Sequence, residues 1–308
     1  MHAIELAKVQ QGTPEWLQIR RQGLGGSDAA AALGISAYKT PYALWLEKRG
    51  EAPELEENAM MKWGKIHEAA VRQEYAEATG RTVRLPDVVF AHPKHQFMLA
   101  SIDGVTDDGR LLEIKTTRNP QGWGEEGSDE VPQHYLLQVQ HYLCVMGLEV
   151  ADVAVLIQGY DFRRYEIPAD LELQEMLIAG EQEFWRTVQE GTPPAVTSVA
   201  EAMQRYKLAR PGDVQADAEM IKTYELLGDV RAKLKEGQAL EDELKAKIMA
   251  YLGEHGGDAL LSGTKPLVTW KERKGSERLD SKALKAAYPD IAAEFTTTGE
   301  PTRTFLVK

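Results

Sequence analysis

The sequence predicts an α/β or α+β fold, with one central mixed sheet flanked by helices. The first observation is element order, because helices, a hairpin, a helix, a second hairpin and a helix follow one another before Pro194. The second is that the residues able to carry out chemistry, above all Asp103 and Glu113, fall on the central strands. The third is a change after Pro194, where the chain becomes charged and extensively helical. We therefore expect two domains, residues 1–195 and 196–308.

The composition limits the classes of protein to which this chain can belong. Its 308 residues are 43% hydrophobic, which is ample for a core. No run is long and apolar enough to span a membrane, and the first residues lack a signal-peptide core. A single cysteine, Cys144, excludes a disulfide framework and a four-cysteine zinc or iron–sulfur site within one chain. We expect a cytoplasmic protein of a bacterial or phage-infected host cell.

The charge balance bears on nucleic-acid binding. A formal net charge of −12 argues against a protein that binds nucleic acid by bulk electrostatics. It leaves room for a nuclease whose basic groups line one channel and whose acidic groups bind metal. The locally basic stretch over residues 271–285 is better explained as a solvated surface than as a DNA contact.

Residues 14–50 predict a helix, a glycine-rich loop and two further helices. The first helix covers residues 14–21, and the loop GLGGSDAAAALG places Ser27 and Asp28 as N-cap residues before an alanine-rich segment. Exposed backbone N–H groups at such a helix start form an anion site suited to a phosphate, with Arg20 close in sequence. The alternative is an ordinary capped helix.

A longer helix is predicted over residues 58–79. Its apolar residues mark one face, and Glu68 falls close to that face. A carboxylate in such a place either reaches out to solvent or contributes to a site. The neighbouring His67 points about 100° away on a helix, so we expect it at the surface rather than in the same site.

A strand over residues 81–91 and a hairpin over residues 99–117 are predicted to form the centre of the sheet. The hairpin strands cover residues 101–105 and 111–117. The turn chemistry between them lies in the Asp-Asp-Gly sequence at residues 107–109.

The hairpin carries a pattern typical of a metal site. Side chains two apart on a strand share a face, so Glu113 and Lys115 point to the same side, and Asp103 reaches it if the strands pair in register. Two carboxylates and an ammonium are costly to bury without compensation. A divalent cation held by the carboxylates compensates them, with the lysine beside a metal-bound water. The alternative is an exposed hairpin with a surface salt bridge.

The segment after the hairpin holds two aromatic candidates. A long polar loop over residues 118–133 carries Trp123, which as an exposed ring beside a metal site can stack on a base. The alternative is that it fills the edge of the core. An apolar helix follows over residues 134–147, on which Gln138 and Tyr142 share a face.

The remaining elements complete the first domain and define the second. Strands at residues 151–158 and 163–167 precede an amphipathic helix at residues 171–190. In the second domain, residues 213–254 predict a long helix or a helical hairpin, because the apolar spacing is interrupted at Gly237. A small α/β segment follows, with strands at 267–274 and 302–307 around a helix at 281–295.

Several of these pieces, in this order, resemble the YqaJ-type phage recombination nucleases, relatives of lambda exonuclease in the PD-(D/E)XK and RecB-like superfamily. The resemblance covers roughly residues 12–195. The matching segments are WLQIRRQGLGGSDAAAALG (16–34), WGKIHEAAV (63–71), SIDG (101–104), LEIKTT (112–117), QVQHYLCVMG (138–147) and EFWRTVQEGTPP (183–194). It implies a restriction-endonuclease-like core.

The resemblance implies a metal site and its ligands. Asp103, Glu113 and the carbonyl of Ile114 are expected to hold a divalent metal, and Lys115 to orient or activate the attacking water. Glu68 stands where the family places a further acidic residue, which often serves a second metal. The implied cofactor is Mg²⁺, with two ions per active site, and Mn²⁺ as a substitute.

The resemblance also assigns residues around the metal. Gln138 is expected to hold Lys115 or the water, and Tyr142 completes a Q-x3-Y pattern shared with RecB-like nucleases. Arg20 and the Ser27-Asp28 loop match the region that receives a 5′ phosphate in lambda exonuclease. These residues and Trp123 form the predicted DNA-binding set.

The implied function is a Mg²⁺-dependent exonuclease that degrades one strand of linear duplex DNA from a 5′ end. It would leave 3′ overhangs for a single-strand annealing protein and act as a homo-oligomer, with a trimer favoured. The alternatives are a structure-selective or nicking endonuclease on the same core and a non-catalytic DNA-end-binding scaffold. Two departures bear on specificity: Ile102 replaces the superfamily's proline, and the glycine loop differs from that of lambda exonuclease.

Overall fold

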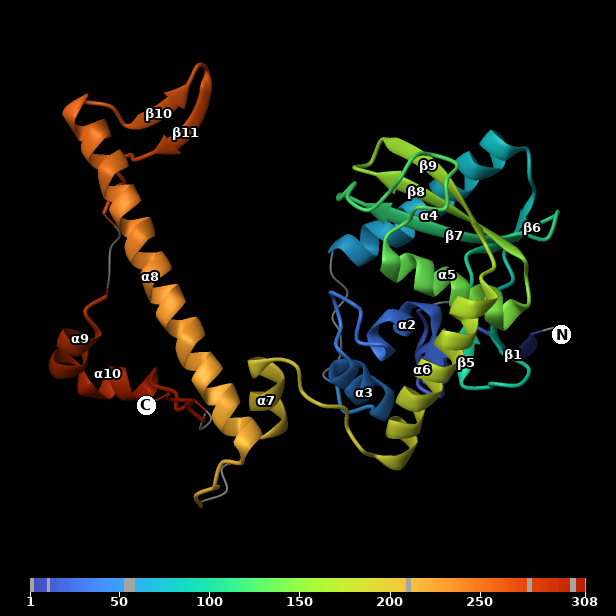
Figure 1. The fold of residues 1–308 in the computed structure, drawn as a ribbon, viewed down its shortest axis with the longest axis horizontal. Helices are drawn as coiled ribbons and strands as arrows, with labels where there is room; N and C mark the ends of the chain where they lie inside the picture. Colours follow the sequence, from blue (N-terminus) through green and yellow to red (C-terminus); the bar gives the residue numbers. More distant parts are fainter. Residues whose placement is uncertain are drawn as a thin grey trace. The chain divides into compact units, whose positions relative to one another are not determined.

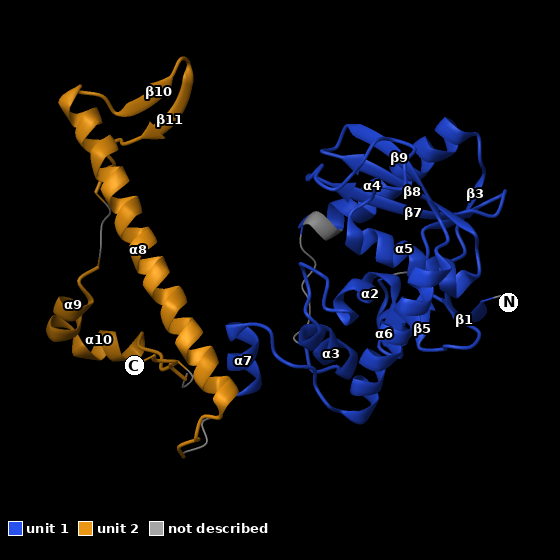
Figure 2. Cartoon of the chain, viewed as in Figure 1, with its two compact units in different colours: residues 1–206 blue, residues 207–308 orange. Residues whose placement is uncertain are grey.

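The computed structural model describes residues 3–9, 12–52, 59–208, 212–275, 279–299 and 303–307. The chain forms two compact units, shown in different colours in Figure 2. We name residues 1–206 the core unit and residues 207–308 the C-terminal unit.

A five-stranded mixed sheet forms the centre of the core unit, and the predicted mixed α/β class is confirmed (Figure 1). The third strand in its order runs antiparallel to the second and parallel to the fourth. In sheet order the strands are β3 (Val83–Arg84), β6 (Gly104–Thr106), β7 (Leu111–Thr117), β8 (Val150–Ile157) and β9 (Asp161–Pro168).

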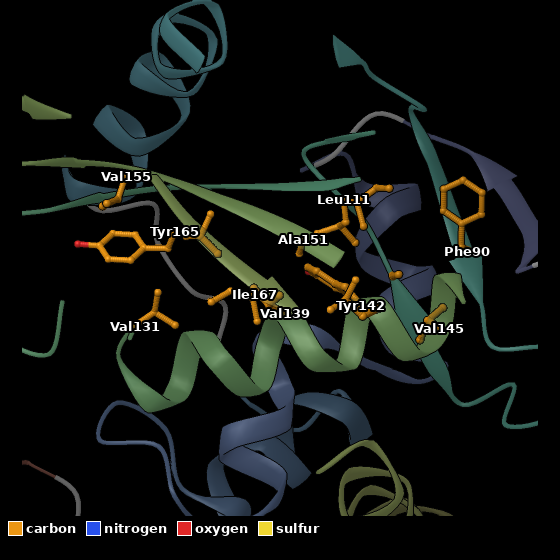
Figure 3. Packing of buried hydrophobic residues seen from close by; sticks show 14 of the residues in the cluster. Phe90, Leu111, Val131, Val139, Tyr142, Val145, Ala151, Val155, Tyr165 and Ile167 are labelled. Carbon is orange, nitrogen blue, oxygen red and sulfur yellow. The ribbon is translucent and has the colours of Figure 1, made fainter. Parts of the chain in front are cut away.

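Helices cover both faces of this sheet. Odd-numbered residues of β7 and β8 face α5 (Gln133–Met146) and pack with Val139, Tyr165 and Ile167 in the main core (Figure 3). Even-numbered residues of these strands face α4 (Ala59–Thr79). The parallel pairing of β7 and β8 needs a crossover, which the loop after β7 and helix α5 provide.

A second sheet was not predicted. It contains four strands in the order β1 (Ile4–Lys8), β4 (Val88–Ala91), β5 (Met98–Ala100) and β2 (Leu24–Gly25). The prediction of one strand over residues 81–91 is wrong, because β3 and β4 belong to different sheets. Pro86 has no N–H for a ladder, and Asp87 adopts a φ of 46°, which turns the chain between the two strands.

Helix α2 (Gly26–Ala32) packs closely against α5. A Cβ at Gly26 would lie 2.6 Å from a ring carbon of Tyr142 and 2.8 Å from the Gln138 carbonyl oxygen, so only glycine allows this approach. The N-cap of α2 is Gly25, which corrects the predicted Ser27-Asp28 cap. The other helices of the core unit are α1 (Pro14–Arg20), α3 (Pro41–Arg49), α6 (Leu171–Glu190) and α7 (Val199–Arg205).

The C-terminal unit is built on one long helix, α8 (Ala218–Glu254). It continues through Gly237, so the helical-hairpin alternative is wrong. The remaining elements are a two-stranded sheet of β10 (Ala259–Ser262) and β11 (Lys265–Thr269), and the helices α9 (Ser281–Ala287) and α10 (Pro289–Glu294).

Two further predictions in this unit are wrong. The helix predicted over residues 281–295 is divided before Pro289, whose ring suits a first helical turn and not a helix interior. The described residues 303–307 form no strand. Among the described residues, no helix is long and apolar enough to cross a membrane.

Candidate active site

Strand β7 supplies two charged side chains to the face covered by α5. Glu113 is 2% exposed, and the Lys115 side chain is 17% exposed. Ile114 between them points to the opposite face, where it packs with Val71 and Tyr75 of α4. The alternation of side chains along a strand therefore brings a carboxylate and an ammonium together beside the core, as the two-residue spacing predicts.

Asp103 lies in a bend between β5 and β6, which corrects its predicted place on a strand. The register pairs Gly104 with Leu112, so Asp103 follows opposite Glu113. Since β6 ends its pairing there, the edge of β7 is open, and the Ile114 N–H donates to Asp103 Oδ2 at 2.8 Å. In a strand the N–H and C=O of one residue point to the same neighbour, so the Ile114 carbonyl faces the side of Asp103.

The Glu113 carboxylate has one satisfied oxygen and one orphaned oxygen. Gln138 Nε2 donates to Glu113 Oε1 at 2.6 Å, and Lys115 Nζ lies 2.6 Å from the same atom. Glu113 Oε2 is buried without a hydrogen-bond partner among the residues that the structure describes. Gln138 was predicted to hold Lys115 or a water, whereas here it holds Glu113.

The two acids are under-compensated. Burial, followed by the charge of Glu113, raises the pKa of Asp103 well above 3.8. Burial also raises the pKa of Glu113 above 4.5, although the Lys115 ammonium partly opposes this. Burial lowers the pKa of Lys115, but Glu113 and Asp103 outweigh it and raise the pKa overall. One ammonium therefore serves two carboxylates, of which Glu113 is buried and Asp103 is half-buried.

The oxygen donors of this site fit a hard divalent cation. Mg²⁺ and Mn²⁺ prefer carboxylate, carbonyl and water oxygens, and the set offers two carboxylates with the Ile114 carbonyl on the same side. Glu113 Oε2, a buried acceptor without a hydrogen-bond partner among the described residues, is an atom that such a cation would satisfy.

Glu68 lies near these acids but has its own partner. It forms an ion pair with Arg72, one helical turn further along α4, and Arg72 Nε donates to the Asp103 carbonyl at 3.3 Å. The charge of Glu68 still raises the pKa of Asp103 and Glu113. Within the described ranges, no three His, Cys, Asp or Glu side chains gather closely enough to hold a metal. Glu68 as a ligand stays a prediction.

The predicted phosphate region is a second buried carboxylate cluster. Asp28 is 1% exposed, and Arg20 Nη2 donates to its two oxygens at 2.9 and 3.0 Å and to Ser27 Oγ at 3.2 Å. Lys48 Nζ, fully buried, lies 2.7 Å from Asp28 Oδ2. Burial alone raises the pKa of Asp28, but Arg20 and Lys48 outweigh it and lower the pKa. Ser27 and Asp28 thus hold Arg20.

The sequence interpretation missed Lys48, although a signal was available. Lys48 stands four residues after Leu44 and three after Trp45, so it shares their buried face of α3. A lysine on a buried helix face needs an anion, and Asp28 is that anion.

Two aromatic residues of the predicted DNA-binding set are buried, and Trp123 follows the alternative in which it fills the edge of the core. Trp123 is 8% exposed, and its ring centre lies 5.6 Å from Tyr135 and 5.2 Å from Tyr165. Tyr142 is 5% exposed and packs against Gly26 in the main core (Figure 3). Both rings fill space between α5 and its neighbours, so neither presents a face to a base.

Comparisons with known proteins identify the family of this chain. A family model of the YqaJ-like viral recombinase domain matches residues 15–149. The uncharacterized protein YqaJ of Bacillus subtilis (strain 168) is 34% identical over 297 residues, which cover 90% of this chain and 88% of that protein. The chain belongs to the YqaJ family. The similarity of this YqaJ-family protein to its Bacillus relative extends over both units, because it covers so much of the chain.

More distant similarities are shorter or lower. The uncharacterized protein R354 of Acanthamoeba polyphaga mimivirus is 28% identical over 171 residues, 51% of this chain and 31% of that protein. An alkaline exonuclease (LHK-Exo) from Laribacter hongkongensis is 21% identical, with a TM-score of 0.48 over 63% of this chain and 98% of that one. A phage related exonuclease from Haemophilus somnus 129PT is 10% identical, with a TM-score of 0.43 over 57% and 98%. Membership of the YqaJ family rests on the Bacillus relative.

Proposed function

We propose that this YqaJ-family protein is a divalent-metal-dependent deoxyribonuclease that hydrolyses phosphodiester bonds at the Asp103–Glu113–Lys115 site. The observation that carries the proposal is that buried Glu113 and half-buried Asp103 share one lysine, while one oxygen of Glu113 has no hydrogen-bond partner among the described residues. Phosphodiester hydrolysis needs the phosphate charge offset and a water activated, and these groups are suited to both. The name of the family, a viral recombinase domain, agrees with DNA as the substrate.

The residues of the site take distinct roles. Asp103, Glu113 and the Ile114 carbonyl hold the cation, which when bound lowers the pKa of a water and offsets the charge of the scissile phosphate. Lys115 Nζ, held 2.6 Å from Glu113, positions the attacking water and adds positive charge. Gln138 fixes the rotamer of Glu113 through its hydrogen bond. Glu68, which the structure pairs with Arg72, would serve a second ion.

Arg20 takes the phosphate of the DNA end. Its guanidinium is fixed by Asp28 and Ser27, while 23% of its side chain remains exposed. A guanidinium already held by a buried acid is preorganised for a second anion. Asp28 and Ser27 act through Arg20 and do not contact the phosphate.

The finer features of the activity follow from the family resemblance. The enzyme uses two Mg²⁺ ions, or Mn²⁺ in their place, and degrades one strand of linear duplex DNA from 5′ to 3′. It releases 5′-phosphorylated products and leaves 3′ overhangs for a single-strand annealing protein. It works as a homo-oligomer, a trimer, in the cytoplasm of the bacterial host cell.

The test compares a covalently closed plasmid with the same plasmid after linearisation, each incubated with the full chain and Mg²⁺. We expect digestion of the linear form alone, with loss of a 5′ label before a 3′ label. Cutting of the closed circle would instead identify an endonuclease. Absence of cleavage of either form, in Mg²⁺ and in Mn²⁺, would leave a DNA-end-binding scaffold and overturn the proposal.

A further inference from the structure

Tyr38 is a large aromatic side chain that the structure leaves open, with 82% of its surface exposed. It lies in the loop between α2 and α3, and that loop is fixed by its own hydrogen bonds. Ser36 Oγ accepts from the N–H groups of Tyr38 at 3.1 Å and Lys39 at 3.2 Å. The carbonyl of Ala30 accepts from the N–H groups of Ile35 and Ser36. Packing does not require an aromatic ring at this position.

A chain of ring contacts connects Tyr38 with the catalytic lysine. The rings of Tyr38 and His134 meet edge to face, with their centres 5.5 Å apart and an interplanar angle of 72°. The His134 ring lies 4.0 Å from that of Tyr135, and Lys115 Nζ lies 4.9 Å from the centre of the Tyr135 ring. Tyr38 therefore stands at the rim of the site, supported by the first turn of α5.

We propose that Tyr38 is a stacking platform for a nucleobase of the DNA strand beside the scissile phosphate. This inference rests on the proposed nuclease function and adds a base subsite to it. An aromatic face accepts every base, which suits an enzyme that degrades DNA regardless of sequence. The buried Trp123 and Tyr142 cannot serve, whereas the Tyr38 ring is exposed.

The charge of the chain supports the same assignment. With a formal net charge of −12, the protein gains little from bulk attraction to DNA. Base stacking adds affinity base by base and needs no positive field. The His134 ring contacts the Tyr38 ring in an edge arrangement.

The experiment pairs a protein substitution with removal of single bases from the DNA. Full-length wild type, Tyr38→Ala, Tyr38→Phe and Tyr288→Ala bind labelled linear duplexes in EDTA, with affinity read by fluorescence anisotropy. Tyr288, 58% exposed in the C-terminal unit, is the matched control. One duplex is intact, and the others each carry one abasic nucleotide, stepped inward from the end. Single-turnover cleavage in Mg²⁺ is measured on the same set.

We expect Tyr38→Ala to bind intact DNA about tenfold more weakly, in line with the loss of one stacked base. Tyr38→Phe keeps the ring and loses far less, and Tyr288→Ala binds as wild type does. At one abasic position wild type weakens by the same factor, and Tyr38→Ala adds no further loss there. The cleavage rates at subsaturating DNA follow the same pattern.

Two results would overturn the base subsite. One is wild-type affinity of Tyr38→Ala for intact DNA. The other is an equal loss of affinity at every abasic position. A loss of affinity in Tyr38→Ala that accompanies a changed particle mass in sedimentation counts with the second result. Failure of the nuclease proposal is separate. A wild type that cleaves nothing, yet binds with the base-dependent pattern at Tyr38, contradicts the proposed hydrolysis alone.

Discussion

Two carboxylate clusters in the core unit differ in how their charge is compensated. Asp28 receives Arg20 and Lys48 at hydrogen-bond distance, and the result is a lowered pKa. Asp103 and Glu113 share Lys115, and both have raised pKa values. The first cluster is satisfied by its own chain, whereas the second keeps an orphaned oxygen on Glu113.

On the proposed function, the difference separates the cluster that fixes Arg20 from the cluster that holds the metal. Buried charges are normally paired, and an unpaired one costs several kcal/mol, on the order of 3–5 kcal/mol when a partner is removed. A carboxylate that the cations of its own chain hold at hydrogen-bond distance needs no further cation from outside. Two acids that share one lysine need a further cation to offset their charge. A bound divalent cation is also what the proposed phosphodiester hydrolysis requires.

The largest expected effect is on catalysis at the unbalanced site. Replacing Lys115 with alanine removes the positioned positive charge, so we expect cleavage of linear duplex to fall by about 10³-fold or more. DNA binding, measured by anisotropy, should remain. Lys282→Ala, an exposed lysine of α9, is the control and should cleave at the wild-type rate. Full activity of a folded Lys115→Ala protein would contradict the assignment.

The balanced site should respond in stability. Asp28→Asn leaves Lys48 buried without its anion, so we expect the free energy of unfolding in urea to drop by about 3 kcal/mol. In metal-free buffer Asp103→Asn should not destabilise, because it removes repulsion. Glu183→Gln, at an exposed partner of Arg186, is the control. The comparison fails if Asp28→Asn and Asp103→Asn shift the unfolding midpoint alike.

A smaller effect, with opposite signs at the two clusters, is expected in the pH dependence of stability. Asp103 and Glu113 have folded pKa values above their ordinary values of 3.8 and 4.5. The native state therefore binds more protons than the unfolded state, and the free energy of unfolding falls as the pH rises above those ordinary values. Asp28 has a folded pKa below 3.8, so its contribution is lost as pH falls below that value. Unfolding midpoints in EDTA across pH measure both arms. Glu113→Gln should flatten the first arm, and Asp28→Asn the second; an unchanged profile in both variants would contradict the compensation account.

Local patterns were enough to predict the elements that position the site. The strand alternation at Glu113 and Lys115 and the apolar helix carrying Gln138 are properties of short segments, and the structure has both at nearly the predicted bounds. The same holds for α6, whose bounds were predicted residue for residue, with Gly191 ending the helix.

Features that depend on pairing between distant segments cannot be predicted from local patterns. The four-stranded sheet depends on β1 meeting β4, a pairing between segments about 80 residues apart that no local pattern encodes. Asp103 sits in a bend because its carboxylate takes the Ile114 N–H in place of a ladder partner. Trp123 is buried because Tyr135 and Tyr165, from two other elements, enclose it. Tyr38 lies in a loop without periodicity, where only the structure reveals its exposure.

The most direct test of the central claim is a calorimetric titration of Mn²⁺ into the metal-free full-length protein. We predict saturable binding to wild type, loss of that binding in Asp103→Asn/Glu113→Gln, and retention of it in Glu183→Gln. Equal binding by the wild type and by Asp103→Asn/Glu113→Gln would contradict the claim that these two acids hold the cation.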